Sequence, residues 1–499
     1  MKTPPVPEPQ AELAAFLAAR AGAAPIATHI SLVFLAPGAA WKLRKAVRLS
    51  FLDFTSLAAR ERFARRELAL NAPAAPGLYR DVVPLVRLAG GGIGFGRARG
   101  ETRPVLDWVL RMARVPAADF LDAIADAGRL DPPLIDALAD AVAEYHAHCP
   151  RARGWPHAAR MRAIAAGNAL AAREAGLDPP AVAAWEAGMG AALDRLGPWL
   201  GARARAGFVR RAHGDLHLGN LCLWHGKPVP FDALEFDEAM ATIDLGYDLA
   251  FLLMDLDRRA GRAAANRAMN RYVARTGDLG MLAGLPAFLS MRALIRAHVA
   301  ARSGNRALGR GYLAAASDYL RPAPARLVAV GGLQGSGKST LARALAPGLG
   351  RAPGALVLRS DEIRKRLWGL APERKLPPAA YAEAVSRRVF RALAAAAGVV
   401  LGAGQAVIAD ATFLAPAHRR AIARAAGAAP FLGLWLDAPL AVLEARVAGR
   451  AGDASDATVA VLRASAAHAR PPADWVAVPA RTRRGALAAA RAALRRAGS

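Results

Sequence analysis

The sequence predicts an α+β module with two lobes, followed by an α/β module built on a parallel sheet. Three observations support this prediction. Short strand-like runs occupy about the first 112 residues, helical apolar spacing dominates about 113–320, and strand-like and helical runs alternate after residue 326. Between the two modules, the segment 321–326 (RPAPAR) has alternating prolines that favour an extended linker. We expect one domain over 1–320 and a second over 327–499.

The small lobe, over about 1–112, is expected to consist of short strands. The runs are ISLVFLA, a Pro37-Gly38 turn and AAWKLRKAV, followed by VVPLVRLA and IGFGRA. The glycine-rich segment 90–96 (GGGIGFG) lies between two of these strands, and its spacing does not match G-x-G-x-x-G. It therefore predicts a hairpin and not a nucleotide loop. The helical lobe follows over about 113–320.

The second module alternates five apolar runs with helical stretches. Such alternation predicts parallel strands joined by crossover helices. The runs are 327–330 (LVAV), 355–359 (ALVLR), 406–409 (AVIA), 431–436 (FLGLWL) and 475–478 (WVAV). The uncharged stretch 392–409 has the length of a membrane span, but its three glycines and a glutamine favour a helix end, a turn and a strand. No membrane partner is expected.

The chain is strongly basic, with 67 Lys and Arg against 40 Asp and Glu and a net charge of +27 over 499 residues. Only seven of the basic residues are lysines, and the arginines are spread through nearly every predicted helix. A nucleic-acid site would require clustered charge, so the spread argues against nucleic acid as a partner. The arginines after Trp475 are expected to form a solvated helix face, with docking of an acidic partner as the alternative.

Two cysteines, Cys149 and Cys222, are too few for a disulfide framework or a structural zinc site and lack a nucleophile constellation. They are expected to be packing residues in a reducing environment. The first residues, MKTPPVPEPQAELAAF, contain prolines and glutamates where a signal peptide would need an apolar core. These features predict a cytoplasmic location.

A complete phosphate-binding motif opens the second module. Residues 332–340 (GLQGSGKST) fit G-x-x-x-x-G-K-[ST] between a predicted strand and a predicted helix. The glycines let backbone N–H groups converge on phosphate, and the helix N-terminus adds favourable partial charge. Lys338 is expected to reach the β/γ-phosphates of ATP and the hydroxyl of Ser339 to bind Mg²⁺. The predicted nucleotide-binding residues of this loop are Gly332, Gly335, Ser336, Gly337, Lys338, Ser339 and Thr340.

The segment of about 327–480 resembles the small P-loop kinases grouped with gluconate kinase, polynucleotide kinase and the zeta-toxin-like kinases. The resemblance rests on GLQGSGKST, SDEIRKRL, ADAT and RVAGR. It implies that Asp361 orients or deprotonates the acceptor hydroxyl, with Arg364 near an acceptor anion, and that Asp410 holds Mg²⁺ or its water. Arg446 and Arg450, one helical turn apart, resemble lid arginines that clamp the transferred phosphate.

Each of these roles has a structural alternative. Asp361 has the position of a helix N-cap, and Asp410 that of a strand-end cap. In a chain so rich in arginine, Arg446 and Arg450 can equally be ordinary helix residues.

The densest polar cluster of the first module is 213–220 (HGDLHLGN), followed by a short hairpin and Asp232. Phosphoryl transfer can use this set, with Asp215 accepting or orienting the acceptor hydroxyl while Asn220 and Asp232 hold Mg²⁺ against the phosphates. H-G-D-x-x-x-x-N and the following aspartate resemble the aminoglycoside phosphotransferase superfamily, which implies a protein-kinase-like fold. His213 and His217 have i,i+4 metal spacing, but without a third ligand they are expected to hold the loop.

The small lobe carries a candidate lysine–glutamate pair. Lys42 lies in a strand and Glu67 in a helical run 25 residues later, the arrangement by which kinase-like folds position the α/β-phosphates. Lys45 is the competing lysine, and Lys42 is preferred because 41–45 (WKLRK) resembles the lysine strand of the superfamily with Lys42 first. A solvated helix charge is the alternative for Glu67. The stretch 105–115 resembles the inter-lobe hinge of the superfamily, with adenine expected at the backbone of about 110–112.

Together the motifs predict an ATP- and Mg²⁺-dependent phosphotransferase with two nucleotide sites and small-molecule hydroxyl acceptors. One alternative is a nucleotide-dependent regulatory or RNA-binding protein. Another is a P-loop kinase whose first module is regulatory. The motifs do not predict an oligomeric state.

Overall fold

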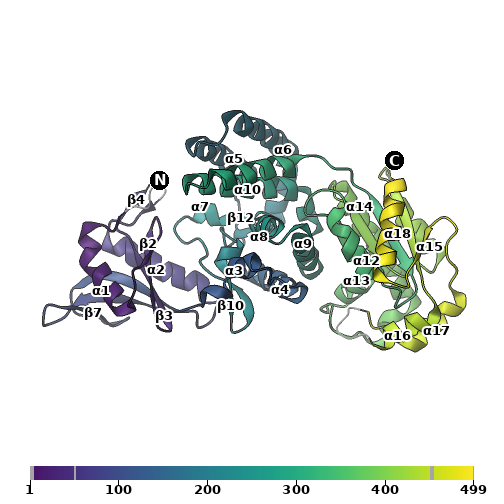
Figure 1. Cartoon of the computed structure of the whole chain (residues 1–499), viewed down its shortest axis with the longest axis horizontal. Helices are drawn as coiled ribbons and strands as arrows, with labels where there is room; N and C mark the ends of the chain where they lie inside the picture. The colour runs from purple at the N-terminus through teal and green to yellow at the C-terminus, as the bar shows by residue number, and fades with distance from the viewer. Residues whose placement is uncertain (1–4, 50–51, 450–454, 498–499) are drawn as a thin grey trace. The chain divides into compact units, whose positions relative to one another are not determined.

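The structure is a computed structural model that describes residues 5–49, 52–449 and 455–497. Contacts divide the chain into two compact units. The first comprises Met1–Asp255 and Met291–Ala316, and the second comprises Leu256–Ser290 and Ser317–Ser499. Figure 1 shows the elements of both units coloured along the chain.

The small lobe of the first unit is a six-stranded antiparallel sheet in the order β1-β2-β3-β8-β6-β7. The strands are β1 (Ile26–Ala27), β2 (Ser31–Ala36), β3 (Ala39–Arg44), β6 (Tyr79–Arg87), β7 (Ile93–Phe95) and β8 (Val105–Ala113). All four predicted strand runs are present, and the glycine-rich segment 90–96 forms the β6–β7 turn and β7, as predicted. A two-stranded ribbon of β4 (Arg48–Leu49) and β5 (Leu52–Asp53) follows β3.

Two helices cover opposite faces of this sheet. Helix α1 (Ala11–Ala21) packs on the face that carries Val109, whereas α2 (Leu57–Asn71) packs on the face that carries Leu110. Adjacent strand residues point to opposite faces, and directly paired residues share a face. Lys42 of β3 pairs with Leu110, so its side chain points toward α2. Ser56 is the N-cap residue of α2, and its side chain accepts a hydrogen bond from the N–H of Ala59.

The helical lobe follows, as predicted for residues after about 113. Its strands form two small antiparallel pairs, β9 with β12 and the β10–β11 hairpin. The helices are α3 (Leu121–Asp126), α4 (Pro132–His148), α5 (His157–Glu174), α6 (Pro179–Arg205), α7 (Glu238–Ala241), α8 (Leu245–Arg259), α9 (Arg262–Thr276), α10 (Leu285–Arg302) and α11 (Arg306–Leu320). The strands are β9 (Val209–Arg211), β10 (Leu221–Trp224), β11 (Lys227–Pro230) and β12 (Thr242–Asp244).

The second unit contains a five-stranded parallel sheet in the order β14-β15-β13-β16-β17. The strands are β13 (Leu327–Gly332), β14 (Leu356–Arg359), β15 (Val407–Asp410), β16 (Phe431–Asp437) and β17 (Val476–Pro479), which confirms all five predicted runs. The helices are α12 (Lys338–Leu345), α13 (Ser360–Leu367), α14 (Glu383–Gly402), α15 (Pro416–Ala425), α16 (Leu440–Ala448), α17 (Val459–His468) and α18 (Arg483–Arg496). Every residue of β13 is buried because it is the central strand, flanked by β15 and β16.

The contact units differ from the predicted division at the linker 321–326, because Leu256–Ser290 groups with the parallel sheet. Helix α9 explains this difference. The side-chain oxygen of Asn270 accepts from the N–H of Val357 at 2.6 Å, and its amide nitrogen donates to the carbonyl of Ala355 at 3.2 Å. Asn266 donates to the same carbonyl at 3.0 Å. β14 is an edge strand of the sheet, so backbone groups on its outer side have no neighbouring strand to bond. The side chains of Asn266 and Asn270 supply hydrogen bonds there.

We expect Asn270→Ala to destabilise the second unit by about 1–3 kcal/mol, since it leaves the part-buried N–H of Val357 on β14 without its partner. Urea unfolding of the full chain measures this loss. Asn168→Ala is the matched control, because the amide nitrogen of Asn168 has no hydrogen-bond partner among the described residues. An equal effect of the two substitutions would contradict the edge-pairing role.

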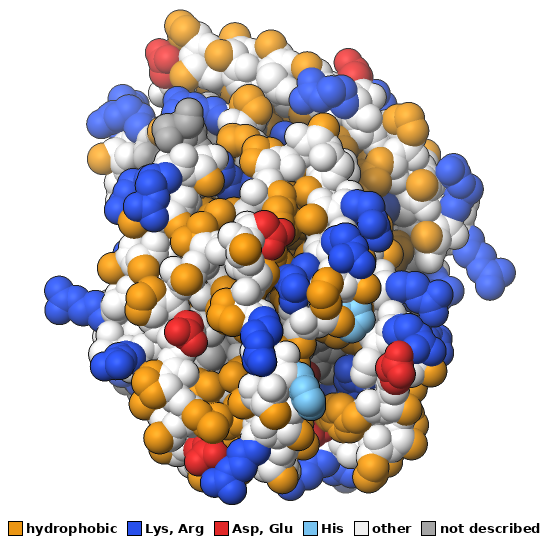
Figure 2. Space-filling view, turned by 90° about the vertical axis from the view of Figure 1, so that its right-hand side faces the viewer, with side chains coloured by type: hydrophobic (Ala, Val, Ile, Leu, Met, Phe, Trp, Pro, Cys, Tyr) orange, Lys and Arg blue, Asp and Glu red, His pale blue; other side chains and the backbone are white. Residues whose placement is uncertain are grey.

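The surface and interior agree with the expectations from composition. On the face shown in Figure 2, Lys and Arg side chains are scattered among apolar and uncharged ones instead of gathering in one stripe. Helix α18 buries Ala486, Ala490 and Ala493 and leaves its arginines exposed, as predicted for a solvated face. Both Cys149 and Cys222 are buried free thiols, which confirms them as packing residues.

The uncharged stretch 392–409 divides as predicted into the end of α14, a turn and β15. None of the helices in the described parts of the chain combines the length and the apolar composition that a bilayer crossing needs.

Candidate active sites

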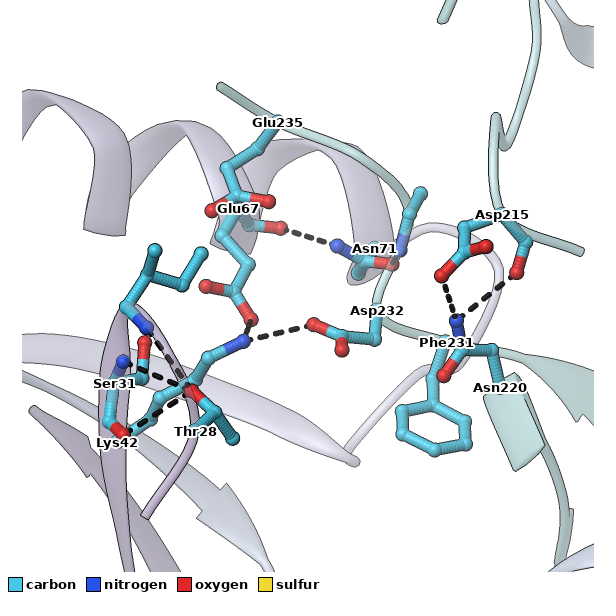
Figure 3. Close-up of polar contacts among 12 residues, drawn as sticks. Thr28, Ser31, Lys42, Glu67, Asn71, Asp215, Asn220, Phe231, Asp232 and Glu235 are labelled. Carbon is cyan, nitrogen blue, oxygen red and sulfur yellow. Dashed lines mark hydrogen bonds and ion pairs between the residues drawn. The ribbon is translucent and has the colours of Figure 1, made fainter. Parts of the chain in front are cut away.

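An ion-paired cluster joins the small lobe to the segment after β11. The Nζ atom of Lys42 lies 2.8 Å from Oε1 of Glu67 on α2 and 2.8 Å from Oδ1 of Asp232 (Figure 3). Glu67 is buried, so the alternative of a solvated helix charge is wrong. The competing lysine, Lys45, donates to the carbonyl of Thr28 at 2.7 Å. The structure therefore brings Lys42, and not Lys45, to the helix carboxylate.

In this cluster, the opposite charges counteract the effect of burial on each other's pKa. Burial by itself lowers the pKa of Lys42, but the carboxylates of Asp232 and Glu67 raise it above its ordinary value. Burial raises the pKa of Glu67, while the cations of Lys42 and Arg44 oppose this rise. Burial also raises the pKa of Asp232, and the charge of Lys42 outweighs it, so the pKa is lowered. Lys42 is therefore an ammonium that faces two acidic groups.

The loop 213–220 places Asp215 beside Asn220. The amide nitrogen of Asn220 donates to Oδ2 of Asp215 at 3.0 Å and to its carbonyl at 2.9 Å (Figure 3). The side chain of Asp215 is 41% exposed, so a substrate can reach its carboxylate. Asp232 has a left-handed backbone, with φ of 59°, and its N–H donates to the hydroxyl of Tyr79. This turn brings Asp232 back toward Lys42.

Buried groups hold this loop from behind. Asp248 on α8 accepts hydrogen bonds from the N–H groups of His213 at 2.9 Å and Gly214 at 3.0 Å. Arg292 on α10 donates to the carbonyl of Gly214 at 3.1 Å. Asp248 is one of several aspartates that follow the hairpin, with Asp237, Asp244 and Asp255, which the sequence alone does not separate, and sequence reasoning missed Arg292. The only sequence signal for Arg292 is a basic residue within an otherwise apolar stretch of helix.

The two histidines of the loop are structural, as expected. The Nε2 atom of His213 lies 2.9 Å from the carbonyl of Phe231, and Nδ1 of His217 accepts from the N–H of Gly219 at 3.0 Å. Within residues 5–49, 52–449 and 455–497, no group of three or more His, Cys, Asp and Glu side chains can hold a metal ion. Mg²⁺ commonly takes only one or two protein oxygens and completes its shell with phosphate and water. The carboxylate of Asp232 and the amide oxygen of Asn220 fit that pattern.

We expect Asp215 to stay ionised throughout pH 5–8. Burial raises its pKa, but a hydrogen bond from His217 and nearby cations outweigh this effect and lower the pKa to about 2. The unfolded value is about 3.9, so the resulting stability is present above pH 4 and is lost as the pH falls toward 2. In urea unfolding, the stability difference between wild type and Asp215→Asn should be constant from pH 8 to 5 and shrink below about pH 4. A change between pH 7 and 5 would contradict this assignment.

The expected inter-lobe hinge needs a correction. Residues 110–112 lie inside β8, which is flanked by β3 on one side and β6 on the other. Their backbone groups are part of these two ladders, so they are not positioned to bind adenine. Arg114–Pro116 are the first residues beyond the strand. A hinge that binds adenine would have to begin there.

The loop 332–337 of the second unit has the backbone that its glycines predict. Gly332 has φ of 134° and Gly335 has φ of 79°, conformations that favour glycine. A Cβ atom at Gly332 would lie 2.6 Å from the carbonyl oxygen of Leu436, and one at Gly335 would lie 2.7 Å from that of Leu443. Gly337 precedes the first residue of α12, so the loop ends at a helix N-terminus. The loop is thus a tight cradle at the carboxyl edge of the sheet.

Side chains of the loop meet the end of the neighbouring strand. The hydroxyl of Ser339 donates to Oδ2 of Asp410 at 2.5 Å, and Nε of Arg359 lies 3.4 Å from the same oxygen. Asp410 therefore contacts the phosphate loop in addition to ending β15. The Nζ atom of Lys338 donates to the carbonyl of Leu333 within the loop. The hydroxyl of Ser336 is buried with no hydrogen-bond partner among the described residues. Thr340 is exposed on the first turn of α12.

Asp361 lies at the same sheet edge, half-buried in the first turn of α13. Arg359 is the N-cap residue of that helix, so the N-cap alternative for Asp361 is wrong. Arg364 is buried, donates to the carbonyl of Ala380 at 2.7 Å and lies over the ring of Tyr381. Burial lowers the pKa of Arg364, and the charge of Asp361 opposes this. The structure therefore places Asp361 and Arg364 within electrostatic reach of each other.

Of the two proposed lid arginines, the structure describes only Arg446. The guanidinium of Arg446 donates to the carbonyls of Ala480 at 3.0 Å and Arg481 at 2.7 Å, and it contacts the carbonyl of Gly335 at 3.5 Å. It thus lies beside the phosphate loop but is held by backbone oxygens. Arg450 lies outside the described residues.

Gly335→Ala is expected to remove nucleotide binding at this loop, because the new Cβ would clash with the carbonyl of Leu443 and strain the positive φ. Calorimetric titration of the full chain with ATP should show one nucleotide fewer per chain. Gly398→Ala, in the interior of α14 with nothing within 4 Å of its Cβ, is the control and should bind as wild type. Unchanged stoichiometry for Gly335→Ala would contradict the cradle.

Comparison with known proteins agrees with the geometry of the second unit. Residues 327–472 match the family model described as AAA domain. This segment is a P-loop domain. Its parallel sheet, glycine loop and following helix are the parts that define such a fold. The first unit combines the six-stranded antiparallel sheet and its Lys42–Glu67 ion pair with a mainly helical lobe.

The similarity extends beyond the P-loop domain. An uncharacterized protein of Mycobacterium tuberculosis is 29% identical over 479 residues, which are 90% of this chain and 90% of that protein. Among solved structures, a choline/ethanolamine kinase family protein from Mesorhizobium loti is 15% identical, with a TM-score of 0.34, over 62% of this chain and 98% of that chain. A gluconokinase from Sinorhizobium meliloti is 23% identical, with a TM-score of 0.25, over 35% of this chain and 97% of that chain.

Proposed function

We propose that the protein is an ATP- and Mg²⁺-dependent phosphotransferase with two nucleotide sites, each of which transfers the γ-phosphoryl group to a hydroxyl of a small molecule. The observation that carries the proposal is that each unit assembles its own phosphate-handling set. In the first unit, Lys42 and Asp232 are ion-paired beside the accessible carboxylate of Asp215. In the P-loop domain, Ser339 and Asp410 are hydrogen-bonded at the mouth of the glycine loop.

In the first site, each residue has a role that its contacts support. Lys42, oriented by Glu67, would bind the α/β-phosphates, and Asn220 with Asp232 would hold Mg²⁺. Bound there, Mg²⁺ would neutralise charge on the phosphates. Asp215 is ionised at neutral pH, so it can orient the acceptor hydroxyl and take its proton during transfer. The hydrogen bond from Asn220 fixes Oδ2 of the carboxylate, and Oδ1 would then accept from the acceptor hydroxyl.

In the P-loop site, the backbone N–H groups of the cradle and Lys338 would bind the β/γ-phosphates. Ser339 and Asp410 supply the hydroxyl and carboxylate oxygens that suit Mg²⁺. Asp361 at the same sheet edge would orient or deprotonate the acceptor hydroxyl. Arg364 would favour an acceptor that carries an anionic group.

A screen of hydroxyl metabolites with γ-labelled ATP tests this function. The wild-type chain, Asp215→Ala and Lys338→Ala are assayed side by side, so that each labelled product is assigned to one site. We expect separate products that disappear with one substitution each. If Asp215→Ala leaves every transfer activity untouched while Lys338→Ala abolishes all of them, the proposal of two active sites fails.

A further inference from the structure

A buried arginine lies directly behind the lysine–glutamate pair. Arg44 is two residues after Lys42 on β3, so both side chains point to the same face of the sheet. Its side chain is only 2% exposed. Its Nη2 atom donates to Oε2 of Glu67 at 2.6 Å and to the carbonyl of Phe63 at 3.1 Å. Each oxygen of the Glu67 carboxylate thus has its own cation, Lys42 on Oε1 and Arg44 on Oε2.

The same arginine reaches a second carboxylate. Its Nη1 atom lies 2.6 Å from Oε1 of Glu235, whose side chain is 5% exposed. Figure 3 shows Glu235 next to Glu67. Glu235 follows Asp232 by three residues on the same irregular segment. Arg44 therefore bridges a helix of the small lobe and the segment that carries Asp232.

That segment is tied to the small lobe at three residues. Asp232 is paired with Lys42, the N–H of Ala233 donates to the side chain of Asn71 at 2.8 Å, and Glu235 is paired with Arg44. The intervening Leu234 donates its N–H to the carbonyl of His213 in the loop that carries Asp215. The segment is thus a strap that connects the lysine strand to the Asp215 loop.

The charges make the bridge necessary. Three acidic side chains, Glu67, Asp232 and Glu235, are paired with two basic ones, Lys42 and Arg44. Without Arg44, buried Glu235 would lose its paired cation and Glu67 would lose one of its two, so Lys42 alone would face three acidic groups. A buried charge that loses its partner is strongly unfavourable, so the side chains would rearrange. Lys42 and Asp232 would then leave the positions that phosphate and Mg²⁺ require.

We propose that Arg44 and Glu235 are positioning residues of the first site, which hold Glu67 and the 232–235 strap so that Lys42 and Asp232 stay aligned for phosphoryl transfer. This inference rests on the proposed function of that site. Neither residue contacts the candidate transfer groups Asp215 and Asn220 in the hydrogen bonds and ion pairs described above. Their effect is therefore on the alignment of the reacting groups, and small misplacements of that kind lower a rate by roughly 10- to 100-fold.

The test uses the full chain with Lys338→Ala, so that the P-loop site is silent, and follows hydrolysis of γ-labelled ATP with water as acceptor. We expect Arg44→Gln and Glu235→Gln each to lower kcat roughly 10- to 100-fold while KM for ATP changes little, which is the signature of lost transition-state alignment. The double variant should be no slower than the slower single variant, because both act through one ion pair.

Arg203→Gln is the matched control. Arg203 is also a buried arginine of the first unit, with Nε 2.5 Å from Asp244 and its guanidinium over the ring of Phe208, but it is not part of the cluster. It should lower stability without lowering kcat of the folded protein. If Arg44→Gln and Glu235→Gln behave as Arg203→Gln does, or if their effects multiply in the double variant, the positioning role is overturned.

Asp215→Ala in the same background separates this inference from the proposed function. Loss of hydrolysis with Asp215→Ala, but not with Arg44→Gln or Glu235→Gln, overturns the positioning role alone. Hydrolysis that survives Asp215→Ala overturns the proposed function of the site itself.

Discussion

Asp215→Ala is expected to lower phosphoryl transfer at the first site by about 10²- to 10⁴-fold, the range that general acid–base groups contribute. The structure supports this expectation because Asp215 is accessible, is ionised at neutral pH and is fixed by the amide of Asn220. Transfer of label from γ-labelled ATP to the acceptor of this site, measured in full-length protein with Lys338→Ala, gives the rate without a contribution from the P-loop.

Asp194→Ala is the control for this measurement, since Asp194 is an exposed carboxylate on α6. It should transfer label at the wild-type rate. Nucleotide affinity should change little in Asp215→Ala, because Asp215 acts on the acceptor and not on the phosphates. A variant that keeps its transfer rate, or that loses only ATP affinity, would contradict the role assigned to Asp215.

Lys338→Ala should lower transfer at the P-loop site by at least about 10²- to 10³-fold, the cost of removing one group that stabilises transition-state charge. The ammonium of Lys338 lies within the loop 332–337, where it bonds the carbonyl of Leu333. No arginine can replace it, because the tight glycine cradle suits a compact charge. Product formation at the P-loop site is measured in full-length protein with Asp215→Ala.

Lys227→Ala is the matched lysine substitution for that experiment. Lys227 is exposed at the start of β11, so its loss should leave the transfer rate unchanged. If Lys338→Ala retains its product while Gly335→Ala loses it, the loop binds phosphate through its backbone alone. That result would refute the role of the lysine.

Local signals determined much of the fold. Strands of the second unit are short apolar runs between helical stretches, and every one of the five was predicted. The signal is strongest for the central strand β13, whose complete burial requires apolar residues throughout. The phosphate loop was equally clear, since its φ angles and close contacts leave glycine as the suitable residue at positions 332 and 335. In both cases neighbouring residues in the chain carry the whole signal.

Long-range contacts set the limits of that prediction. The preference for Lys42 over Lys45 came from resemblance, whereas the ion pair with Glu67 selects it by geometry. The expected hinge at 110–112 was wrong because nothing local shows that β8 runs on to Ala113 between two partner strands. The N-cap alternative for Asp361 failed in the same way, since the N-cap residue of α13 is Arg359, two residues earlier.

The sequence by itself determined two modules, their element order and the residue types that handle phosphate. Motifs and hydrophobic periodicity can be read from the sequence because they depend on residues that are close together in the chain. Only the tertiary structure decided that α9 pairs the edge of β14, and that Arg44 and Glu235 stand behind the Lys42–Glu67 pair. The physical reason is that an ion pair or edge hydrogen bond depends on distance in space. Arg44 and Glu235 are 191 positions apart, and no local pattern joins them.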